Sequence, residues 1–530
     1  MATREEHIRT AVSRRSFLKS TAILGGGLAT AGPLHALGWR AASGAPLRRG
    51  TGYGPLVDKG DLWLPEGFEY QIISRQGDLQ SDGTITAGIF DGTAAYRGPG
   101  GTTILIRNHE NRRQGGEIPV VVPAEYRYDP DPSYNAGNSK LRVQRRPVGR
   151  LPNGRLQYEY EVVESFNILG GTDVNCAGGV VGRSWVTCEE VVNRSVLSGL
   201  KHGYNYEIPA DADGPVLARP ILGAGRFVHE AVAWSDGILY QSEDRGLQSD
   251  MRLGTIGSVL YRYIPEDYDP DLGLDADATG GGEGFFGNGV RKRWLADTTG
   301  KFQALKLKDE WHANMDVGRE VGRPYEVEWI DVPEPDHDDD TDNRRDRVPG
   351  FTPTRIQAQD LGAAFFDRQE GMWTDEFYGG DDAAGEHSDH GLGRRAPKVF
   401  FDCTTGGAAN LGQLWEYDPN TETITLVYES TSSALLQSPD NIVVVPHTGD
   451  IFLQEDGSGA QFVRGVTRDG AIYDFARTTA NDSEFCGGCF DPDGHTFYVS
   501  QQGDRGSLPA GPLNGNAVTY AIYGPFGGDR

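Results

Sequence analysis

Four segments of the chain share one layout, and this repetition constrains the fold more than any other feature of the sequence. Each segment begins with a potential metal ligand, continues into a short apolar strand, turns at a glycine-containing stretch and returns along a second strand. The segments are residues 175–190, 229–244, 439–456 and 483–502. Antiparallel hairpins repeated along one chain are typical of a β-propeller, in which each repeat supplies one blade. We therefore predict an all-β propeller.

The ends of these repeats carry the residues that can do chemistry. The repeats begin with Cys176, Glu230, Asp440 and Glu484. Three of them close on an acidic pair and the fourth on two glutamines: Glu189–Glu190, Glu243–Asp244, Glu455–Asp456 and Gln501–Gln502. Because the inner strands of a propeller line one channel, ligands at equivalent strand ends converge on its axis. Acidic turn formers would explain one such hairpin, whereas four hairpins with the same layout predict a shared central metal site.

The composition agrees with a turn-rich all-β protein and narrows its partners. The 530 residues include 73 Gly and 29 Pro, and aromatic residues make up 10%. The formal net charge of −26 disfavours binding to nucleic acid or to an anionic membrane surface and favours the concentration of cations. One acidic stretch, residues 331–347, could bind calcium, but a solvated acidic loop is the interpretation that we favour.

The N-terminus predicts export. The stretch "SRRSFLKS" places Arg14 and Arg15 before an apolar run, as twin-arginine signals do, although an Arg-Arg pair can also occur by chance. We therefore expect residues 1–45 to be a signal peptide and linker, and residues 46–530 to be a single propeller domain. The twin-arginine machinery would be a partner, and the mature protein would be periplasmic or extracellular. No later segment of the sequence is long and apolar enough to span a membrane.

The cysteines suggest which metal the site binds. There are five, an odd number, so at least one thiol in an exported protein is unpaired or bound to a metal. Carboxylates favour calcium, and a thiolate among them favours a transition metal such as iron or zinc. Cys176 lies in a sharp glycine-rich turn, where it is either such a ligand or a buried apolar thiol. Cys486 and Cys489, in "CGGC", fit a local disulfide or a redox pair.

Two further segments indicate an anionic substrate. Arg368 and Glu370 are two residues apart, so both side chains lie on one face if the segment is a strand. A guanidinium beside a cluster of cations is useful when an anion binds between them, and phosphate matches its forked geometry. The second segment is the polar cluster "RNHENRR", in which Asn108 follows the apolar run "TTILI". A metal-bound oxygen nucleophile together with an arginine predicts hydrolysis of a phosphate ester.

These motifs together resemble the PhoX alkaline phosphatases, which are twin-arginine-exported bacterial enzymes. The matching stretches keep their order over roughly residues 50–525. They are "NHE" at 108, "NCAGG" at 175, "TCEE" at 187, "GRFVHEA" at 225, "SEDR" at 242, "RQEG" at 368, "GQLWEYDP" at 412, "SPDN" at 438, "EDG" at 455 and "SEF" at 483 followed by "FDPDG". The chain departs from the family in a shorter loop, "VVGRSWV", after "NCAGG", and in an additional cysteine, Cys486.

The resemblance implies a six-bladed propeller with loop insertions and a buried cluster of two Fe³⁺ and three Ca²⁺ ions, bridged by an oxo group and a thiolate. It implies that Cys176 bridges the irons and that Arg368 and Asn108 hold the phosphate. The metal ligands that it implies are Cys176, Glu189, Glu190, Glu230, Glu370, Asp440, Asp456 and Glu484. The expected protein is an exported phosphomonoesterase that scavenges phosphate from phosphate esters, and we expect a monomer.

Two other functions fit a propeller of this kind. A calcium-dependent lactonase or esterase uses carboxylates and asparagine around calcium, and needs neither Cys176 nor Arg368. A non-catalytic exported propeller that binds a partner would carry structural calcium and would be colourless, whereas a ferric thiolate cluster absorbs visible light.

Overall fold

The computed structural model describes residues 51–113, 117–270, 294–342, 350–375, 395–446, 448–479, 482–503 and 517–526. The predicted signal peptide and linker, residues 1–45, lie outside these ranges, as does the end of the acidic stretch after residue 342. The described residues belong to one compact unit, Thr51–Arg530. Among them, no helix has the length and hydrophobicity needed to cross a membrane.

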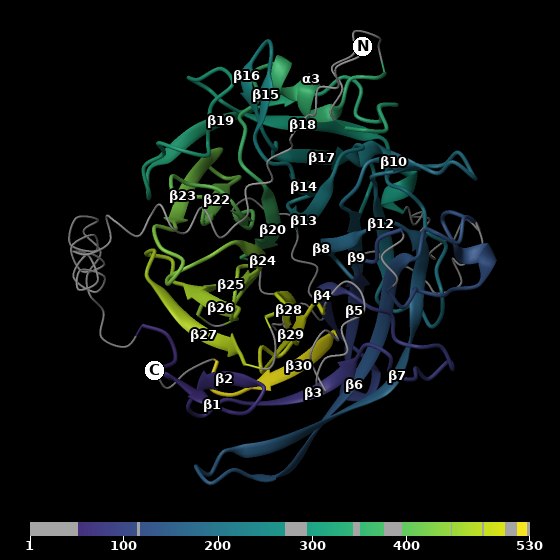
Figure 1. The fold of residues 1–530 in the computed structure, drawn as a ribbon, viewed down its shortest axis with the longest axis vertical. Helices are drawn as coiled ribbons and strands as arrows, with labels where there is room; N and C mark the ends of the chain where they lie inside the picture. Colours follow the sequence, from purple (N-terminus) through teal and green to yellow (C-terminus); the bar gives the residue numbers. More distant parts are fainter. Residues whose placement is uncertain are drawn as a thin grey trace, which may run out of the picture. The chain divides into compact units, whose positions relative to one another are not determined.

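The described residues form an all-β structure of five larger sheets and two small ribbons (Figure 1). The first larger sheet contains β4 (Phe90–Arg97), β5 (Thr103–His109), β6 (Ala136–Arg150) and β7 (Leu156–Thr172). The second contains β8 (Asn175–Val181), β9 (Ser184–Glu189) and β12 (Asn205–Pro209).

The third sheet has nine strands and bends back on itself. In spatial order it contains β13 (His229–Ser235), β14 (Ile238–Glu243), β17 (Tyr261–Pro265), β18 (Gly300–Leu307), β19 (Pro324–Asp331), β23 (Thr423–Glu429), β22 (Gln413–Asp418), β21 (Val399–Cys403) and β20 (Gln369–Thr374). Its two edge strands, β13 and β20, pack against each other, so the sheet is nearly closed.

The last two larger sheets join the two ends of the described chain. The fourth contains β24 (Pro439–Val444), β25 (Ile451–Glu455), β26 (Phe462–Val466), β27 (Ile472–Thr478), β2 (Leu62–Pro65) and β1 (Leu56–Asp58). The fifth contains β28 (Phe485–Phe490), β29 (Thr496–Gln501), β30 (Val518–Tyr523) and β3 (Glu69–Arg75). Strands from the N-terminal part of the described chain therefore complete two sheets whose other strands come from its C-terminal part.

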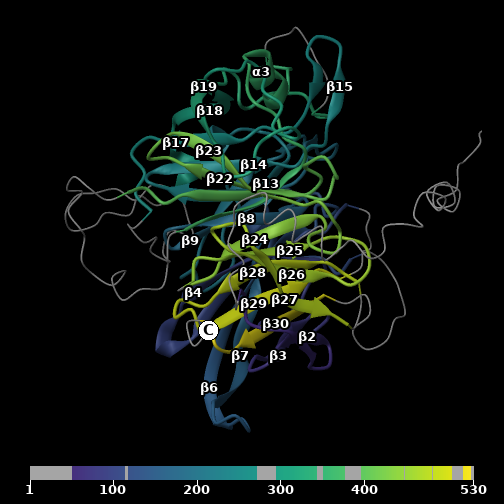
Figure 2. The ribbon, with the colours of Figure 1, turned by 90° about the vertical axis from the view of Figure 1, so that its left-hand side faces the viewer.

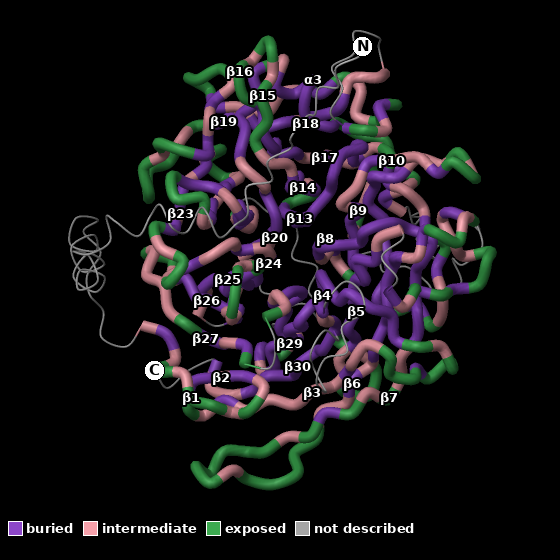
Figure 3. Tube along the Cα trace, viewed as in Figure 1, coloured by how far each residue is buried: buried purple, intermediate pink, exposed green. Residues whose placement is uncertain are grey.

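The remaining elements lie in loops. The ribbons are β10 (Asn193–Arg194) with β11 (Lys201–His202), and β15 (Gln248–Asp250) with β16 (Gly254–Ile256). The helical elements are α3 (Thr354–Asp360) and the 3₁₀ turns η1 (Pro99–Gly101), η2 (Ala124–Tyr126), η3 (Leu222–Ala224) and η5 (Leu295–Asp297). In Figure 2 the hairpin of β6 and β7 extends beyond the rest of its sheet, and Figure 3 shows that its tip is exposed.

Six strands form the centre of the structure. β4, β8, β13, β20, β24 and β28 pack against one another in that order, and β28 packs against β4. These inner strands are buried on both faces (Figure 3), and β28 ("FCGGCF") is buried along its whole length. Aromatic side chains join neighbouring sheets: the rings of Phe452, in β25, and Phe497, in β29, are 5.4 Å apart. The inner strands thus converge on one region, as the repeats predicted.

The described part of the acidic stretch is paired with basic side chains and alternates between exposed and buried residues, so it is only in part the solvated loop that we predicted. Arg194 contacts Asp338 at 3.1 Å and Asp340 at 2.9 Å, and the buried Arg226 contacts Asp340 at 3.0 Å. Lys201 contacts Asp336 at 2.7 Å. The pairing neutralises a run of carboxylates that would otherwise repel one another.

Candidate metal centre

Each inner strand has a β-bulge near its start. Its first residue pairs with the second strand of the hairpin; the first pairs are Phe90–His109, Asn175–Glu189, His229–Glu243, Gln369–Cys403, Pro439–Glu455 and Phe485–Gln501. In five of the six strands the register shifts directly after this pair, and in β28 it shifts one residue later, after Cys486 has paired with Ser500. In each hairpin, the residue directly after the first residue of the inner strand is called the opening residue. The residue directly after the partner of that first residue, in the second strand, is called the closing residue. Because bulges re-aim side chains, the opening residues occupy equivalent positions around the centre.

The opening and closing residues are mostly ionisable. The opening residues are Asp91, Cys176, Glu230, Glu370, Asp440 and Cys486. The closing residues are Glu110, Glu190, Asp244, Thr404, Asp456 and Gln502. The fourth sequence repeat departs from the expected layout, because its opening residue is Cys486 and the predicted ligand Glu484 lies two residues earlier.

Three groups of the described residues could each hold a metal ion. Within each group the ligand atoms lie within 4.8 Å of one another; the groups are Cys176–Glu190–Glu230, Glu230–Glu370–Asp440 and Asp440–Asp456–Glu484. Glu230 and Asp440 each belong to two groups, so the three groups form one continuous cluster. The cluster contains the metal ligands predicted from the sequence, with the exception of Glu189.

Left-handed backbone residues precede four of the opening residues. Ile89, Val174, Arg368 and Ser438 have φ values of 45°, 52°, 55° and 50°, and each lies two residues before an opening residue. In a non-glycine residue this conformation is strained, because the Cβ atom lies too close to the backbone. Strain repeated at four equivalent positions marks them as functionally constrained, because such residues persist only where the surroundings enforce them.

Residues without bulky side chains let the inner strands approach one another. A Cβ atom on Gly92 would lie 2.7 Å from the Cα of Ala177 in the next inner strand. A Cβ atom on Gly371 would lie 2.6 Å from the carbonyl oxygen of Asp440. Both glycines directly follow an opening residue, so they bring neighbouring ligands close together.

The carboxyl groups of the cluster are crowded, and all but that of the exposed Asp456 are buried or half-buried. Burial and the neighbouring Glu190, Asp440 and Asp91 raise the pKa of Glu230 well above its ordinary value. Burial and Asp456 raise the pKa of Asp440 to about 7. Buried carboxylates that repel one another are costly unless a cation binds them. The set of oxygen donors and one thiol therefore fits metal ions, with the thiol favouring a transition metal at the Cys176 end.

Arg368 lies at the edge of this cluster. Its Nε and Nη2 atoms each donate to one carboxylate oxygen of Asp244 over 2.9 Å, and Nη2 lies 2.7 Å from Glu370 Oε1. Glu370 and then Asp244 raise the pKa of Arg368, although burial opposes them. The side chain is 37% exposed. A permanently charged fork is thus held beside a metal group and within reach of solvent, where it can meet an anion.

Asn108 lies behind Cys176 and is fully buried. Its Nδ2 donates to the carbonyl oxygens of Cys176 and Ala177 over 2.8 and 2.6 Å. Its Oδ1 accepts hydrogen bonds from Trp185 Nε1, over 2.8 Å, and from Asn138. The predicted contact between Asn108 and phosphate stays a prediction.

Glu189 belongs to a hydrogen-bond network outside the three groups. Its carboxylate accepts hydrogen bonds from the backbone N–H groups of Asp173 and Gly203, over 3.0 and 2.8 Å. It also lies 2.7 Å from His202 Nδ1. Burial alone would lower the pKa of His202, but Glu189 and Asp129 outweigh it and raise that pKa to about 9. The contacts of Glu189 are therefore those of a structural carboxylate.

Several residues of the centre were not among the predicted site residues. Burial and the neighbouring Glu110 and Asp440 raise the pKa of Asp91. Arg112, with a side chain that is 41% exposed, contacts Glu110 and lies 3.5 Å from Glu190. Residues 90–110 follow the layout of the four repeats, with an acid at each end. That signal could have identified Asp91 and Glu110.

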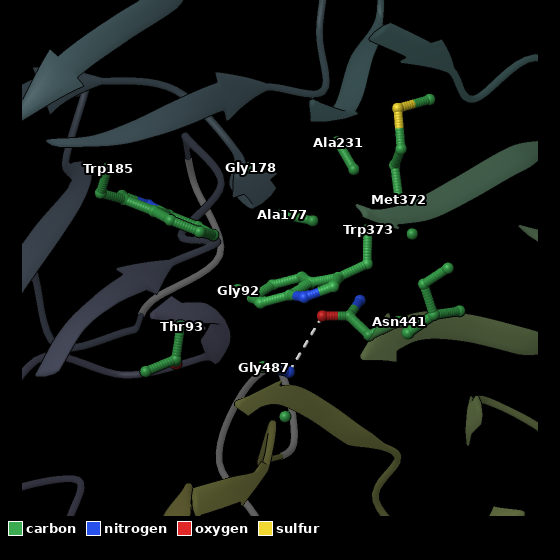
Figure 4. Close-up of a pocket in the computed structure, with 13 residues that line it drawn as sticks. Gly92, Thr93, Ala177, Gly178, Trp185, Ala231, Met372, Trp373, Asn441 and Gly487 are labelled. Carbon is green, nitrogen blue, oxygen red and sulfur yellow. Dashed lines mark hydrogen bonds between the residues drawn. The ribbon is translucent and has the colours of Figure 1, made fainter. Parts of the chain in front are cut away.

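A small pocket lies between the inner strands, lined by residues from all six of them (Figure 4). The Trp373 indole lies across it, beside Gly92 and Asn441 (Figure 4). Asn441 Oδ1 accepts a hydrogen bond from the N–H of Gly487 over 2.9 Å, which ties β24 to β28. The inner strands therefore surround one narrow space that an aromatic side chain fills.

The five cysteines are all free and buried in the structure, so Cys486 and Cys489 do not form the disulfide that was one interpretation of "CGGC". Cys176 is buried, as its alternative interpretation required, but it also belongs to a potential metal group.

Comparisons with known proteins give a family and a fold. The family model described as alkaline phosphatase PhoX matches residues 51–504. The structure of Pseudomonas fluorescens PhoX in complex with vanadate, a transition state analogue, is 16% identical, with a TM-score of 0.58 over 90% of this chain and 98% of that chain. A Dyadobacter fermentans protein of unknown function is 8% identical, with a TM-score of 0.38 over 87% of this chain and 100% of that chain. No curated protein matches the sequence.

Proposed function

The chain belongs to the PhoX alkaline phosphatase family, a family of metal-dependent phosphatases, and from that premise we propose that it is an exported phosphomonoesterase with an oxo-bridged cluster of two Fe³⁺ and three Ca²⁺ ions. One observation carries the proposal: three potential metal groups are linked through Glu230 and Asp440 and so form one cluster, which is buried at Cys176, Glu230 and Glu370 and exposed at Asp456. The family membership favours a phosphatase over the lactonase and over the non-catalytic propeller.

We propose a six-bladed arrangement of the all-β fold. The closed order of the six inner strands supports it, and so do their equivalent bulges. In this arrangement the nine-stranded sheet consists of two blades that β19 joins, through its pairing with β18 and β23. Each of the other larger sheets is one blade, with β3 completing the last one.

The proposed ligands are the residues of the three groups: Cys176, Glu190, Glu230, Glu370, Asp440, Asp456 and Glu484. Glu189 is left out, because its carboxylate is engaged with His202 and two backbone N–H groups. When bound, the ions would neutralise the carboxylates, polarise the phosphate ester and activate the attacking oxygen. Without them, six carboxylates would repel a phosphate dianion, so binding of substrate requires the loaded site.

Arg368 would hold the phosphate from the open side of the cluster. Its guanidinium stays charged at every working pH and offers paired donors that match phosphate oxygens. Asp244 fixes the plane of this guanidinium through two hydrogen bonds of 2.9 Å, so the fork is oriented before the substrate arrives. Arg112, beside Glu110 and Glu190, would supply a second positive charge on the other side.

Export and biological role are further parts of the proposal. Residues 1–45 would be a twin-arginine signal peptide and linker, residues 46–530 one propeller domain, and the mature protein a periplasmic or extracellular monomer. The sequence "SRRSFLKS" supports this organisation. An exported phosphatase would release phosphate from esters that cannot enter the cell, so its production should rise on phosphate starvation.

The proposed function can be tested by the class of substrate that the protein hydrolyses. Purified mature protein would be assayed with p-nitrophenyl phosphate, bis(p-nitrophenyl) phosphate and an aliphatic δ-lactone. We expect hydrolysis of the monoester, at a rate that falls when Arg368 is replaced by Ala. Hydrolysis of the lactone without release of phosphate from either ester would contradict the proposal and support the calcium-dependent lactonase.

A further inference from the structure

A repeated position in the second strand of each hairpin faces the next inner strand. In each hairpin this position directly precedes the residue of the second strand that pairs with the first residue of the inner strand. The residues at this position are Asn108, Cys188, Ser242, Asp402, Gln454 and Ser500. Three of these side chains form hydrogen bonds with the backbone of the following inner strand. Asn108 bonds to β8, Ser242 to β20 and Gln454 to β28.

Two of these contacts are made to the opening residues that are proposed metal ligands. Asn108 Nδ2 donates to the carbonyl oxygen of Cys176 over 2.8 Å. Ser242 Oγ donates to the carbonyl oxygen of Glu370 over 2.6 Å. All four residues are buried. Equivalent positions thus make equivalent contacts in two separate parts of the ring of inner strands.

The bulges explain why these carbonyl groups need a donor from outside their own sheet. In β8 the register passes from Asn175 directly to Gly178, so Cys176 and Ala177 have no partner residue in β9. In β20 it passes from Gln369 to Met372, which leaves Glu370 without a partner. A buried carbonyl without a hydrogen bond is costly, and the side chain that bonds to it also fixes the orientation of its peptide.

The orientation of these peptides sets the direction of the ligand side chains. A bulge aims its extra residue through the local backbone geometry, and a ligand must be held within a narrow range of positions to bind a metal well. We propose that Asn108 and Ser242 are positioning residues, which hold the bulge carbonyls of Cys176 and Glu370 and so aim the thiolate and the carboxylate at the metals. This inference rests on the proposed metal centre.

The assignment differs from the role of phosphate holder that the family resemblance implies for Asn108. Both the donor and the acceptor sides of its amide are already engaged, with the carbonyls of Cys176 and Ala177 and with Trp185 and Asn138. The side chain is 0% exposed. To contact phosphate, it would have to release the Cys176 bulge.

The test compares three variants of the full mature protein. Asn108→Asp keeps the size of the side chain but places oxygen against two carbonyls, and Ser242→Ala removes one hydroxyl. Asn167→Asp is the matched control, because Asn167 is buried and its amide also donates to a backbone carbonyl, that of Val121, away from the inner strands. The readouts are the metal retained during timed exposure to a chelator, and the inhibition constant of inorganic phosphate for the metal-loaded fraction.

We expect both test variants to lose metal at least about tenfold faster than the wild type and the control, because outer partners of metal ligands have effects of this size. The phosphate inhibition constant of the loaded fraction should change less than twofold. Metal retention at the wild-type rate in Asn108→Asp and Ser242→Ala would overturn the inference, whatever happens to phosphate inhibition. If Asn108→Asp does not fold, Ser242→Ala decides alone.

The wild-type sample separates this inference from the proposed function. A wild type without metal or phosphatase activity would contradict the proposed function itself. A wild type that holds metal and hydrolyses the monoester, with variants that retain metal equally well, would contradict the positioning role alone.

Discussion

Cys176 and Cys486 are the opening residues of β8 and β28, yet only Cys176 belongs to a potential metal group. Their local settings are alike. Cys176 Sγ lies 3.5 Å from the carbonyl oxygen of His229 in the next inner strand, and Cys486 Sγ lies 3.0 Å from that of Phe90. Two thiols thus lie against the next inner strand, although Cys176 lies within the bulge of β8 and Cys486 pairs with Ser500 before the bulge of β28.

The difference lies in the closing residue. Beside Cys176 it is Glu190, which adds a carboxylate to the group. Beside Cys486 it is Gln502, whose Nε2 donates to Glu110 over 2.7 Å and to Asp91 over 3.3 Å. The amide satisfies two carboxylates by hydrogen bonds where a cation would otherwise be needed. We infer that the closing residue separates these two places: the carboxylate of Glu190 completes a metal group beside Cys176, and the amide of Gln502 completes none beside Cys486.

The largest expected effect comes from removing each thiol. Cys176→Ala should lose iron and reduce kcat by at least about 100-fold, since it removes a ligand and not only an outer partner. Cys486→Ala should keep its iron and its kcat within about twofold, because it removes a buried thiol with no place in the metal groups. Elemental analysis and steady-state kinetics on both variants check this. Similar losses of iron in the two variants would show that the two thiols have equal roles.

Arg368 should matter for substrate and not for metal. Arg368→Ala is expected to reduce kcat/KM by about 100- to 1,000-fold, as the loss of a preorganised charge does elsewhere, with metal content close to that of the wild type. Kinetics and elemental analysis on the same preparation provide the measurement. A parallel loss of metal would mean that Arg368 acts mainly by holding Glu370 in place.

Gln502→Glu should make the place beside Cys486 resemble the one beside Cys176. In the metal-free protein the new carboxylate would face Glu110 and Asp91 without donating to them, so we expect the free energy of unfolding to fall by about 1.5–3 kcal/mol. Urea denaturation of metal-free wild type and variant measures this. Added calcium should reverse the loss in the variant, and a loss that calcium leaves unchanged would contradict the comparison.

The smallest expected effect concerns the strained residue before β24. Ser438 has a φ of 50°, and Ser438→Gly should relieve about 1–2 kcal/mol of strain while losing about 0.4–1 kcal/mol to the entropy of the unfolded chain. A net stabilisation of up to about 1.6 kcal/mol is expected, which thermal denaturation can measure. Ser458→Gly is the control, because Ser458 is not among the residues with positive φ, and it should destabilise the protein slightly.

The all-β fold could be predicted from the repeated hairpin layout, and the residues of the metal groups from the resemblance to the PhoX family. The choice between Glu189 and Glu190 could not. Glu189 ends β9 and Glu190 follows it, and the bulge in β8 together with the partners of Glu189 decides which one joins Cys176. A pattern of residues contains no information on such partners, which come from the distant residues His202 and Gly203.

Asn108 illustrates a second limit. Its place at the end of an apolar strand could be predicted, but its contacts depend on how closely β5 lies to the bulge of the neighbouring sheet. Asp91 and Glu110 are a different case. Glu110 lies in the polar cluster "RNHENRR", which the sequence indicated without assigning it a role. Asp91 was missed because only four repeats were aligned, although residues 90–110 form a further hairpin of the same layout.

The central claim is that the three ligand groups form one metal centre that hydrolyses phosphate esters. The most direct measurement is the metal content of purified mature wild type together with its hydrolysis of p-nitrophenyl phosphate, before chelation, after chelation and after return of the metals. We expect both iron and calcium, activity that disappears on chelation, and activity that returns with the metals. Calcium without iron and no release of phosphate, or full activity in the metal-free protein, would contradict the account.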